Sequence, residues 1–157
     1  MAVVYERPVR FEEVDAAGIA FFARFFNWCH EAMERFFDGI PNGYVNLILK
    51  RRIGFPAVHL TADWKSPLRY GDVARIETSV VKVGTTSASF RYVLTRVSDG
   101  AHCATIEHTT VSTDLDTMTK RPLPDDCRKL LEAHLATASG GSRQPNVEDI
   151  TLIPSKG

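Results

Sequence analysis

The residues best placed to do chemistry are a carboxylate and a glycine that precede a very apolar segment. Asp15 lies three residues before Gly18, and a run rich in phenylalanine begins just after it. If that run is a helix, its N-terminus offers unpaired N–H groups and the positive end of the helix dipole. Such donors can hold a polarised carbonyl oxygen while a nearby carboxylate attacks the carbonyl or activates water. Alternatively, Asp15 serves as a helix cap or turn residue.

Other catalytic signatures are absent from the sequence. It contains no Gly-rich phosphate loop, no HExxH, no pair of CxxC motifs and no GxSxG. The three cysteines follow no disulfide or metal spacing, and His102 and His108 have no evident third ligand. The sequence therefore favours chemistry that uses neither a metal nor a cofactor.

A long helix is expected to follow the candidate carboxylate, from about Ile19 to Asp38. At about 100° per residue its apolar side chains cover roughly 200°, whereas a surface helix usually has a stripe only somewhat wider than about 100°. Gly39 and Pro41 end the pattern. We expect a sheet to wrap this helix and a partner to cover it further.

Strand-like alternation lies on both sides of this helix. Residues 3–11 form the first candidate strand, and Pro8 indicates an edge position or a bulge. Residues 125–135 have the pattern of a closing helix. Four further strands, separated by short turns typical of an antiparallel meander, are expected at about 57–67, 73–83, 87–98 and 101–114. The expected fold is α+β, with one helix on one face of a single sheet.

Composition is that of an ordinary globular protein. The 157 residues suffice for one domain, and 19 basic and 19 acidic side chains give zero formal net charge. No overall field therefore attracts nucleic acid or an anionic membrane. There is no apolar signal core and no run near 18 apolar residues, so a cytoplasmic location is expected. Linker-like composition divides the chain into a domain, 1–138, and a flexible tail, 139–157.

Three segments resemble motifs of the 4-hydroxybenzoyl-CoA thioesterase family. Residues 9–19, VRFEEVDAAGI, are similar to its signature, in which a basic-aromatic strand end leads into Asp, two small residues, Gly and an aliphatic residue. The turn PLRYGD at 67–72 and the hairpin VGTTSASF at 83–90 follow in the family's order. The resemblance implies a hotdog fold, a curved antiparallel sheet of about five strands around one long helix. It also implies a homodimer, or a dimer of dimers, with active sites at the subunit interface.

The resemblance further implies hydrolysis of an acyl-CoA thioester without any cofactor beyond the coenzyme A of the substrate. Asp15 would be the catalytic carboxylate, the backbone N–H of Phe22 an oxyanion donor, and Gly18 the place where a Cβ would crowd the thioester. Relatives often carry Asp-x-Asp here, and Glu13 takes the first of these places. Phe21 and Phe22 replace the Tyr-His of a short-chain branch, which favours an apolar, aromatic acyl pocket.

Four residues are candidates for contact with the acyl group. His30 stands where aromatic-acyl members of the family use an Asp to read a ring hydroxyl, although a hydrogen-bonded histidine at a buried margin is the alternative. His59, near Trp64, either faces the pocket or lies on a solvated face. Phe25 belongs to the aromatic group from which two or three members would line the pocket.

The phosphates of coenzyme A require local cations despite the zero net charge. Arg69, Lys82 and Arg91 are the candidates that the resemblance suggests, and residues 50–52, KRR, are a second possibility. Arginine suits bidentate phosphate contacts. Solvated surface charge is the alternative for each of them.

The predicted function is therefore hydrolysis of an acyl-CoA thioester, with an aromatic acyl group of the benzoyl or hydroxybenzoyl type. A short aliphatic acyl group is an alternative. A hotdog dehydratase of 3-hydroxyacyl thioesters is another, and would need Glu31 or Glu34 as its helix acid. A non-catalytic acyl-CoA-binding domain, in which Asp15 is only structural, is the third. No nucleic-acid or membrane partner is expected.

Overall fold

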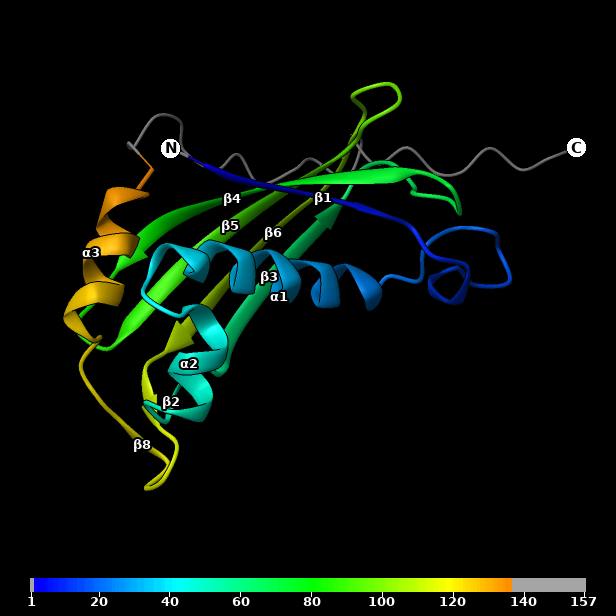
Figure 1. Ribbon diagram of the computed structural model, residues 1–157. Coiled ribbons are helices and arrows are strands. Elements are labelled where there is room, and N and C mark those ends of the chain that lie inside the picture. The colour runs from blue at the N-terminus through cyan, green and yellow to red at the C-terminus, as the bar shows by residue number, and fades with distance from the viewer. Residues whose placement is uncertain (1, 137–157) are drawn as a thin grey trace, which may run out of the picture.

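The computed structural model describes residues 2–136, in which a five-stranded antiparallel sheet curves over a central helix (Figure 1). The strand order is β1-β4-β5-β6-β3. These strands are β1 (Val3–Pro8), β3 (Ala57–Trp64), β4 (Val73–Val83), β5 (Ser87–Arg96) and β6 (His102–Val111). The predicted tail, 139–157, and the boundary at 138 lie outside the described residues. No helix within residues 2–136 is long and apolar enough to cross a membrane.

Helix α1 (Arg24–Phe36) lies along the inner face of the sheet and continues through a 3-10 turn, η2 (Phe37–Gly39) (Figure 1). Its buried side chains recur three and four residues apart and form the core with the inward residues of β4, β5 and β6. The buried residues of α1 are Phe25, Trp28, Cys29, Ala32, Met33 and Phe36.

The predicted start of this helix at Ile19 is wrong by five residues. Ala20 pairs with Val14 in a short antiparallel bridge, and its N–H donates to Leu68 O at 2.7 Å. These bonds hold residues 19–20 in an extended conformation, so helical hydrogen bonding begins only at Arg24. The apolar periodicity continues across this boundary and therefore could not mark it.

The strands occur where the sequence predicts them, but their order differs from a simple meander. β4, β5 and β6 are neighbours in chain order, whereas β3 pairs with β6 at the far edge of the sheet. Residues 65–72 carry the chain from one edge towards the other, with Leu68 buried on the way. β1 is the opposite edge, as Pro8 predicted, but it ends at Pro8 and is followed by a 3-10 turn, η1 (Phe11–Glu13).

Smaller elements close one end of the molecule. Helices α2 (Gly43–Leu49) and α3 (Asp125–Ala133) accompany a second sheet made of β2 (Ile53–Gly54), β7 (Thr113–Asp114) and β8 (Thr119–Lys120). Arg51, two residues after α2, binds Asp126 of α3 through a bidentate pair at 2.7 and 2.9 Å. The closing helix α3 confirms the pattern seen at 125–135.

Candidate active site

A cavity of about 360 Å³ lies at the N-terminal end of α1, between the turn that contains Asp15 and the end of β3. It brings together four residues predicted from the sequence, namely Asp15, Phe22, Phe25 and Trp64. Its walls are otherwise largely apolar. The remaining residues that line this Asp15 cavity are Ile19, Ala20, Phe21, Lys65, Ser66, Pro67 and Leu68.

Asp15 begins a tight turn that ends at Gly18. The N–H of Gly18 donates to Asp15 O at 2.9 Å, and the N–H of Asp15 donates to Ile19 O at 2.9 Å. The side-chain atom Oδ1 accepts the N–H of Ala17 at 2.8 Å. Within residues 2–136 the second oxygen, Oδ2, accepts no hydrogen bond. The turn role of Asp15 is therefore real, and it leaves one carboxylate oxygen free at the cavity.

Gly18 has a backbone conformation that by itself favours glycine. Its φ is +77°, in the left-handed region that side chains with a Cβ rarely adopt. A Cβ at this position would meet no atom of the described chain within 4 Å. The turn conformation therefore favours glycine here, and crowding of the thioester by a Cβ stays a prediction.

Backbone donors face no acceptor just before α1. Arg24 N–H donates to Phe21 O and Phe25 N–H to Phe22 O, which closes the turn at the helix start. The N–H groups of Phe22 and Ala23 have no acceptor in the part of the chain that the structure describes. The predicted oxyanion donor therefore belongs to the turn that precedes the helix, where Phe22 is more than half exposed.

Aromatic rings form one wall of the cavity. The Trp64 ring makes edge contacts with Phe22, Phe25 and Phe26, with centroids 6.1, 6.1 and 6.0 Å away. The Trp64 Nε1–H is buried and has no partner in residues 2–136. This wall can pack against a flat ring and also offers it a hydrogen-bond donor.

The two candidate histidines do not line this cavity. His30 is exposed on α1, where it pairs with Glu34 at 3.1 Å and its ring contacts Tyr44 edge-on. His59 lies five residues from Trp64 on β3, so strand alternation places it on the opposite face of the sheet. The solvated alternative therefore holds for His59. The odd spacing between His59 and Trp64 is visible in the sequence and already indicates opposite faces of a strand.

The predicted phosphate-binding cations are dispersed. Arg91 lies on the outer face of the sheet, paired with Glu107 at 2.7 Å, and Lys82 is exposed at the far end of β4. Arg69 is exposed in the loop that follows the cavity wall. The cation that lines the cavity is Lys65, which sequence reasoning missed although it directly follows Trp64.

Two of the three basic residues at 50–52 form ion pairs within the protein. Arg51 pairs with Asp126, and Arg52 donates to Asp116 at 2.9 Å. Both acids are distant in sequence, at separations of 75 and 64 residues, so local patterns do not reveal these pairs. We therefore do not assign Arg51 or Arg52 to coenzyme A.

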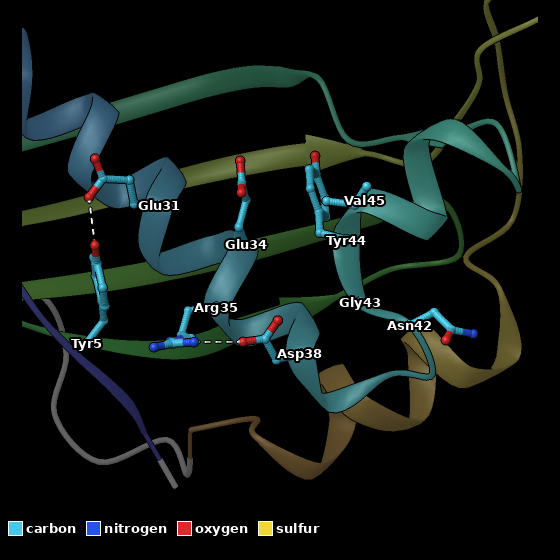
Figure 2. Close-up of a pocket in the computed structure, with 9 residues that line it drawn as sticks. All are labelled: Tyr5, Glu31, Glu34, Arg35, Asp38, Asn42, Gly43, Tyr44 and Val45. Carbon is cyan, nitrogen blue, oxygen red and sulfur yellow. Dashed lines mark hydrogen bonds and ion pairs between the residues drawn. The ribbon is translucent and has the colours of Figure 1, made fainter.

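A second, acidic groove of about 400 Å³ lies between β1, α1 and α2 (Figure 2). Glu31 and Glu34, the helix acids that a dehydratase would need, line this groove and not the Asp15 cavity. Glu31 accepts Tyr5 OH at 3.0 Å and pairs with Arg7, while Glu34 pairs with His30. This placement does not favour dehydratase chemistry at the Asp15 cavity.

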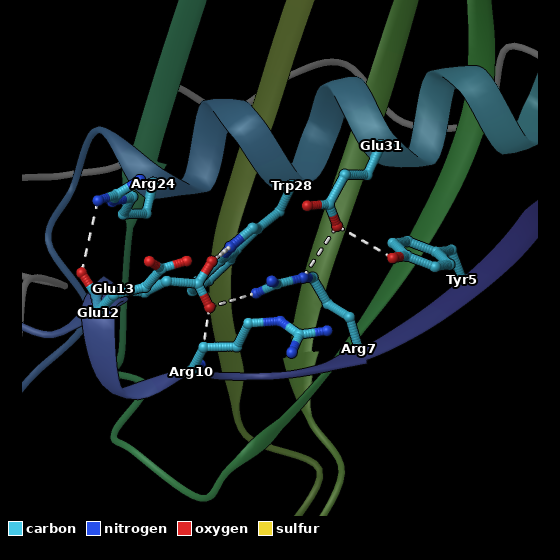
Figure 3. Close-up of polar contacts among 8 residues, drawn as sticks. All are labelled: Tyr5, Arg7, Arg10, Glu12, Glu13, Arg24, Trp28 and Glu31. Carbon is cyan, nitrogen blue, oxygen red and sulfur yellow. Dashed lines mark hydrogen bonds and ion pairs between the residues drawn. The ribbon is translucent and has the colours of Figure 1, made fainter.

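Glu13 is a buried carboxylate with three hydrogen-bond donors around it (Figure 3). Burial raises its pKa, but hydrogen bonds from Arg7, Trp28 and the Arg10 N–H outweigh that effect and leave the pKa below its usual value. Glu13 is therefore ionised at neutral pH.

A curved antiparallel sheet around a central helix is the hotdog fold, and here a carboxylate lies beside the helix start. Residues 9–131 match the model of the Thioesterase-like superfamily, and the chain belongs to this family. The predicted fold and family are confirmed.

Similar proteins agree with this class. A 1,4-dihydroxy-2-naphthoyl-CoA hydrolase of Nostoc punctiforme is 30% identical over 148 residues, which cover 94% of this chain and 99% of the relative. The crystal structure of a thioesterase superfamily protein from Jannaschia is 30% identical, with a TM-score of 0.78 over 87% of this chain and 94% of that one. A gentisyl-coenzyme A thioesterase structure is 28% identical, with a TM-score of 0.72 over 80% and 99%. The protein is an acyl-CoA thioesterase, as predicted.

Proposed function

We propose that this protein hydrolyses the coenzyme A thioester of a hydroxylated aromatic acid, with Asp15 as the catalytic carboxylate. The observation that carries this proposal is the position of Asp15 in an apolar cavity walled by Phe22, Phe25 and Trp64. The names of two similar proteins, which specify dihydroxynaphthoyl-CoA and gentisyl-coenzyme A, support an aromatic acyl group for this chain.

In the proposed reaction the thioester carbonyl oxygen accepts hydrogen bonds from the free N–H groups of Phe22 and Ala23. These donors stabilise the negative charge that develops as the carbonyl carbon becomes tetrahedral. Oδ2 of Asp15 attacks that carbon or removes a proton from the attacking water, while Ala17 N–H holds Oδ1 in place. The carbon–sulfur bond then breaks, and the departing thiolate of coenzyme A takes up a proton, from Asp15 in the water route and from solvent in the direct route. Direct attack leaves an acyl–Asp15 anhydride, which a water molecule then hydrolyses to release the acid and restore the carboxylate. The products are the acid and free coenzyme A.

The acyl ring is proposed to pack against Trp64, whose free Nε1–H is suited to a ring hydroxyl. A hydroxyl-reading role for His30 would need a second subunit, since His30 does not line the cavity of its own chain. Lys65 and Arg69 are the proposed partners of the coenzyme A phosphates because both lie on the segment that borders the cavity.

A homodimer is also proposed. β3 is an edge strand that is exposed over most of its length, with Val58 61% and Leu60 42% exposed. An open edge with apolar side chains invites pairing with another strand. Phe22, at 57% exposure, lies at the cavity and would be covered by the same partner.

The test is thiol release by the wild type and by Asp15→Asn on a panel of aryl- and alkyl-CoA thioesters. We expect aryl substrates to be preferred and Asp15→Asn to lower their turnover by about 10²- to 10⁴-fold. Asp99→Asn is the matched control, because Asp99 Oδ1 accepts Ala101 N–H in a similar turn at 3.0 Å, away from the cavity. Full activity of Asp15→Asn would remove Asp15 from the chemistry, and a preference for short alkyl substrates would replace the aromatic proposal.

A further inference from the structure

Glu13 uses both oxygens of its carboxylate within the protein. Oε1 accepts Arg7 Nη1 at 2.8 Å and the Arg10 N–H at 2.7 Å, and Oε2 accepts Trp28 Nε1 at 2.7 Å (Figure 3). Only 5% of the residue is exposed, and it does not line the Asp15 cavity. This carboxylate is therefore unavailable to substrate. It instead joins β1, the turn η1 and the second turn of α1.

The main chain of Glu13 closes the loop that carries Asp15. Phe21 N–H donates to Glu13 O at 2.9 Å, and Val14 pairs with Ala20 directly inside that bond. Residues 13–21 therefore form a hairpin with the Asp15 turn at its tip. The free N–H of Phe22 follows the hairpin by one residue. Phe22 and Ala23 then join the hairpin to α1, which begins at Arg24.

The bond from Trp28 Nε1–H to Glu13 Oε2 joins this hairpin to the body of α1. Trp28 is fully buried, and the Arg7 guanidinium lies 4.8 Å from its ring centroid. Arg24, the first residue of α1, adds a longer contact to Glu12 O at 3.4 Å. Arg7 also pairs with Glu31 at 2.9 Å, on the side of the cluster remote from Asp15. Arg7 thus has two acid partners: Glu13, which belongs to the Asp15 hairpin, and Glu31, which does not.

We propose that Glu13 is a positioning residue, which clamps the Asp15 hairpin onto α1 through Trp28 and makes no contact with substrate. This inference rests on the function proposed for Asp15. A displacement of about 1 Å in a reacting group can cost on the order of 10²-fold in rate. Loss of the clamp is therefore expected to lower kcat without a comparable rise in KM.

The test compares Glu13→Gln and Trp28→Phe with Glu31→Gln. A glutamine side chain has a single acceptor oxygen, so in Glu13→Gln its NH₂ group must face either the Trp28 N–H or the donors of Arg7 and Arg10. Trp28→Phe removes the bond to Glu13 from the other side. We expect each variant to lower kcat at least tenfold, with KM changed less than about threefold. Glu31→Gln removes the other acid partner of Arg7 and is expected to lower the melting temperature but not kcat.

The double variant Glu13→Gln/Trp28→Phe makes the test specific. If both changes act through one bond, kcat of the double variant equals that of the worse single variant. The proposal would be overturned if the loss of kcat in the double variant equalled the product of the two single losses. An equal loss of kcat in Glu31→Gln would also overturn it. Trp28→Phe keeps it testable if Glu13→Gln does not fold.

Amide hydrogen exchange separates this inference from the role of Asp15. The amides of Ala17 and Phe21 are bonded within the hairpin and are expected to exchange faster in Glu13→Gln and Trp28→Phe, but not in Glu31→Gln. Unchanged exchange in both clamp variants would refute positioning. Faster exchange together with an active Asp15→Asn would leave the clamp standing and reject only the proposed catalytic carboxylate.

Discussion

At the scale of single residues, Asp15 and Asp99 make the same local hydrogen bond but lie in different surroundings. Each accepts the N–H two residues ahead with its Oδ1, at 2.8 and 3.0 Å. Asp99 also pairs with Arg96 at 3.1 Å, in an exposed hairpin. Asp15 has no such pair in the described chain, and its turn borders an apolar cavity. A turn carboxylate becomes a candidate for catalysis because its second oxygen is left free beside backbone donors.

His108 should make stability depend on mildly acidic pH. Its ring stacks on Phe90 and Tyr92, and burial, followed by the charge of His30, lowers its pKa to about 4. The unfolded value is about 6.5, so the folded protein binds fewer protons than the unfolded chain between these values. The contribution of neutral His108 to the free energy of unfolding is fully present above about pH 6.5. It is lost as the pH decreases towards 4, by on the order of 3 kcal/mol.

Thermal unfolding of the wild type and of His108→Phe between pH 7 and 5 checks this expectation. Phenylalanine keeps an aromatic ring in the stack and cannot titrate. Most carboxylates remain ionised over this range, so they contribute little to the slope. The variant should show a clearly flatter dependence of melting temperature on pH, and an unchanged slope would contradict the burial of a neutral His108.

At the scale of elements, the late start of α1 creates the donor site. Because Ala20 bonds to Leu68 and pairs with Val14, the chain is still extended there, and residues 22–23 form a turn before helix begins at Arg24. Two N–H groups at that turn lack acceptors in residues 2–136, and β3 ends beside them with Trp64. The meeting of a helix start, a strand end and the Asp15 hairpin thus builds one cavity from three segments.

The aromatic wall predicts acyl preference. Replacing Trp64 with leucine removes its edge contacts and its free Nε1–H while keeping an apolar side chain. An aromatic pair contributes about 0.5–1.5 kcal/mol, so the ratio of kcat/KM for aryl-CoA to alkyl-CoA should fall roughly twofold to twelvefold. Phe11→Leu, at an exposed ring outside the cavity, is the control. An unchanged ratio in Trp64→Leu would place the acyl group elsewhere.

At the scale of the whole molecule, the two edges of the sheet differ. The β1 edge contains Pro8 and charged residues, which discourage strand addition. The β3 edge carries exposed apolar side chains and runs directly to the Asp15 cavity. A partner along β3 would therefore cover both the edge and the exposed ring of Phe22.

Charge placed on each edge tests the proposed homodimer. Leu60 on β3 and Val4 on β1 are similarly exposed, at 42% and 41%. We expect Leu60→Lys to shift sedimentation from dimer to monomer, because a lysine at the interface costs at least about 1.4 kcal/mol, or tenfold in Kd. Thiol release should fall with it. Val4→Lys should remain dimeric and active, and equal behaviour of the two variants would argue against pairing along β3.

Much of the fold followed from local patterns in the sequence. Alternation located β4, β5 and β6, the phenylalanine-rich run located α1, and Pro8 marked an edge strand. The motif around Asp15 identified the family that residues 9–131 match. These features could be predicted because side-chain periodicity and turn residues act over a few neighbouring positions.

What only the tertiary structure decided are the contacts between segments that are distant in sequence. The partners of Arg51 and Arg52 lie 75 and 64 residues away, and β3 reaches the far edge of the sheet beside β6. Glu13 is a buried clamp and not a second reactive acid because Arg7 and Trp28 reach it from β1 and α1. Such contacts depend on the order and packing of whole elements, which no local pattern in the chain encodes.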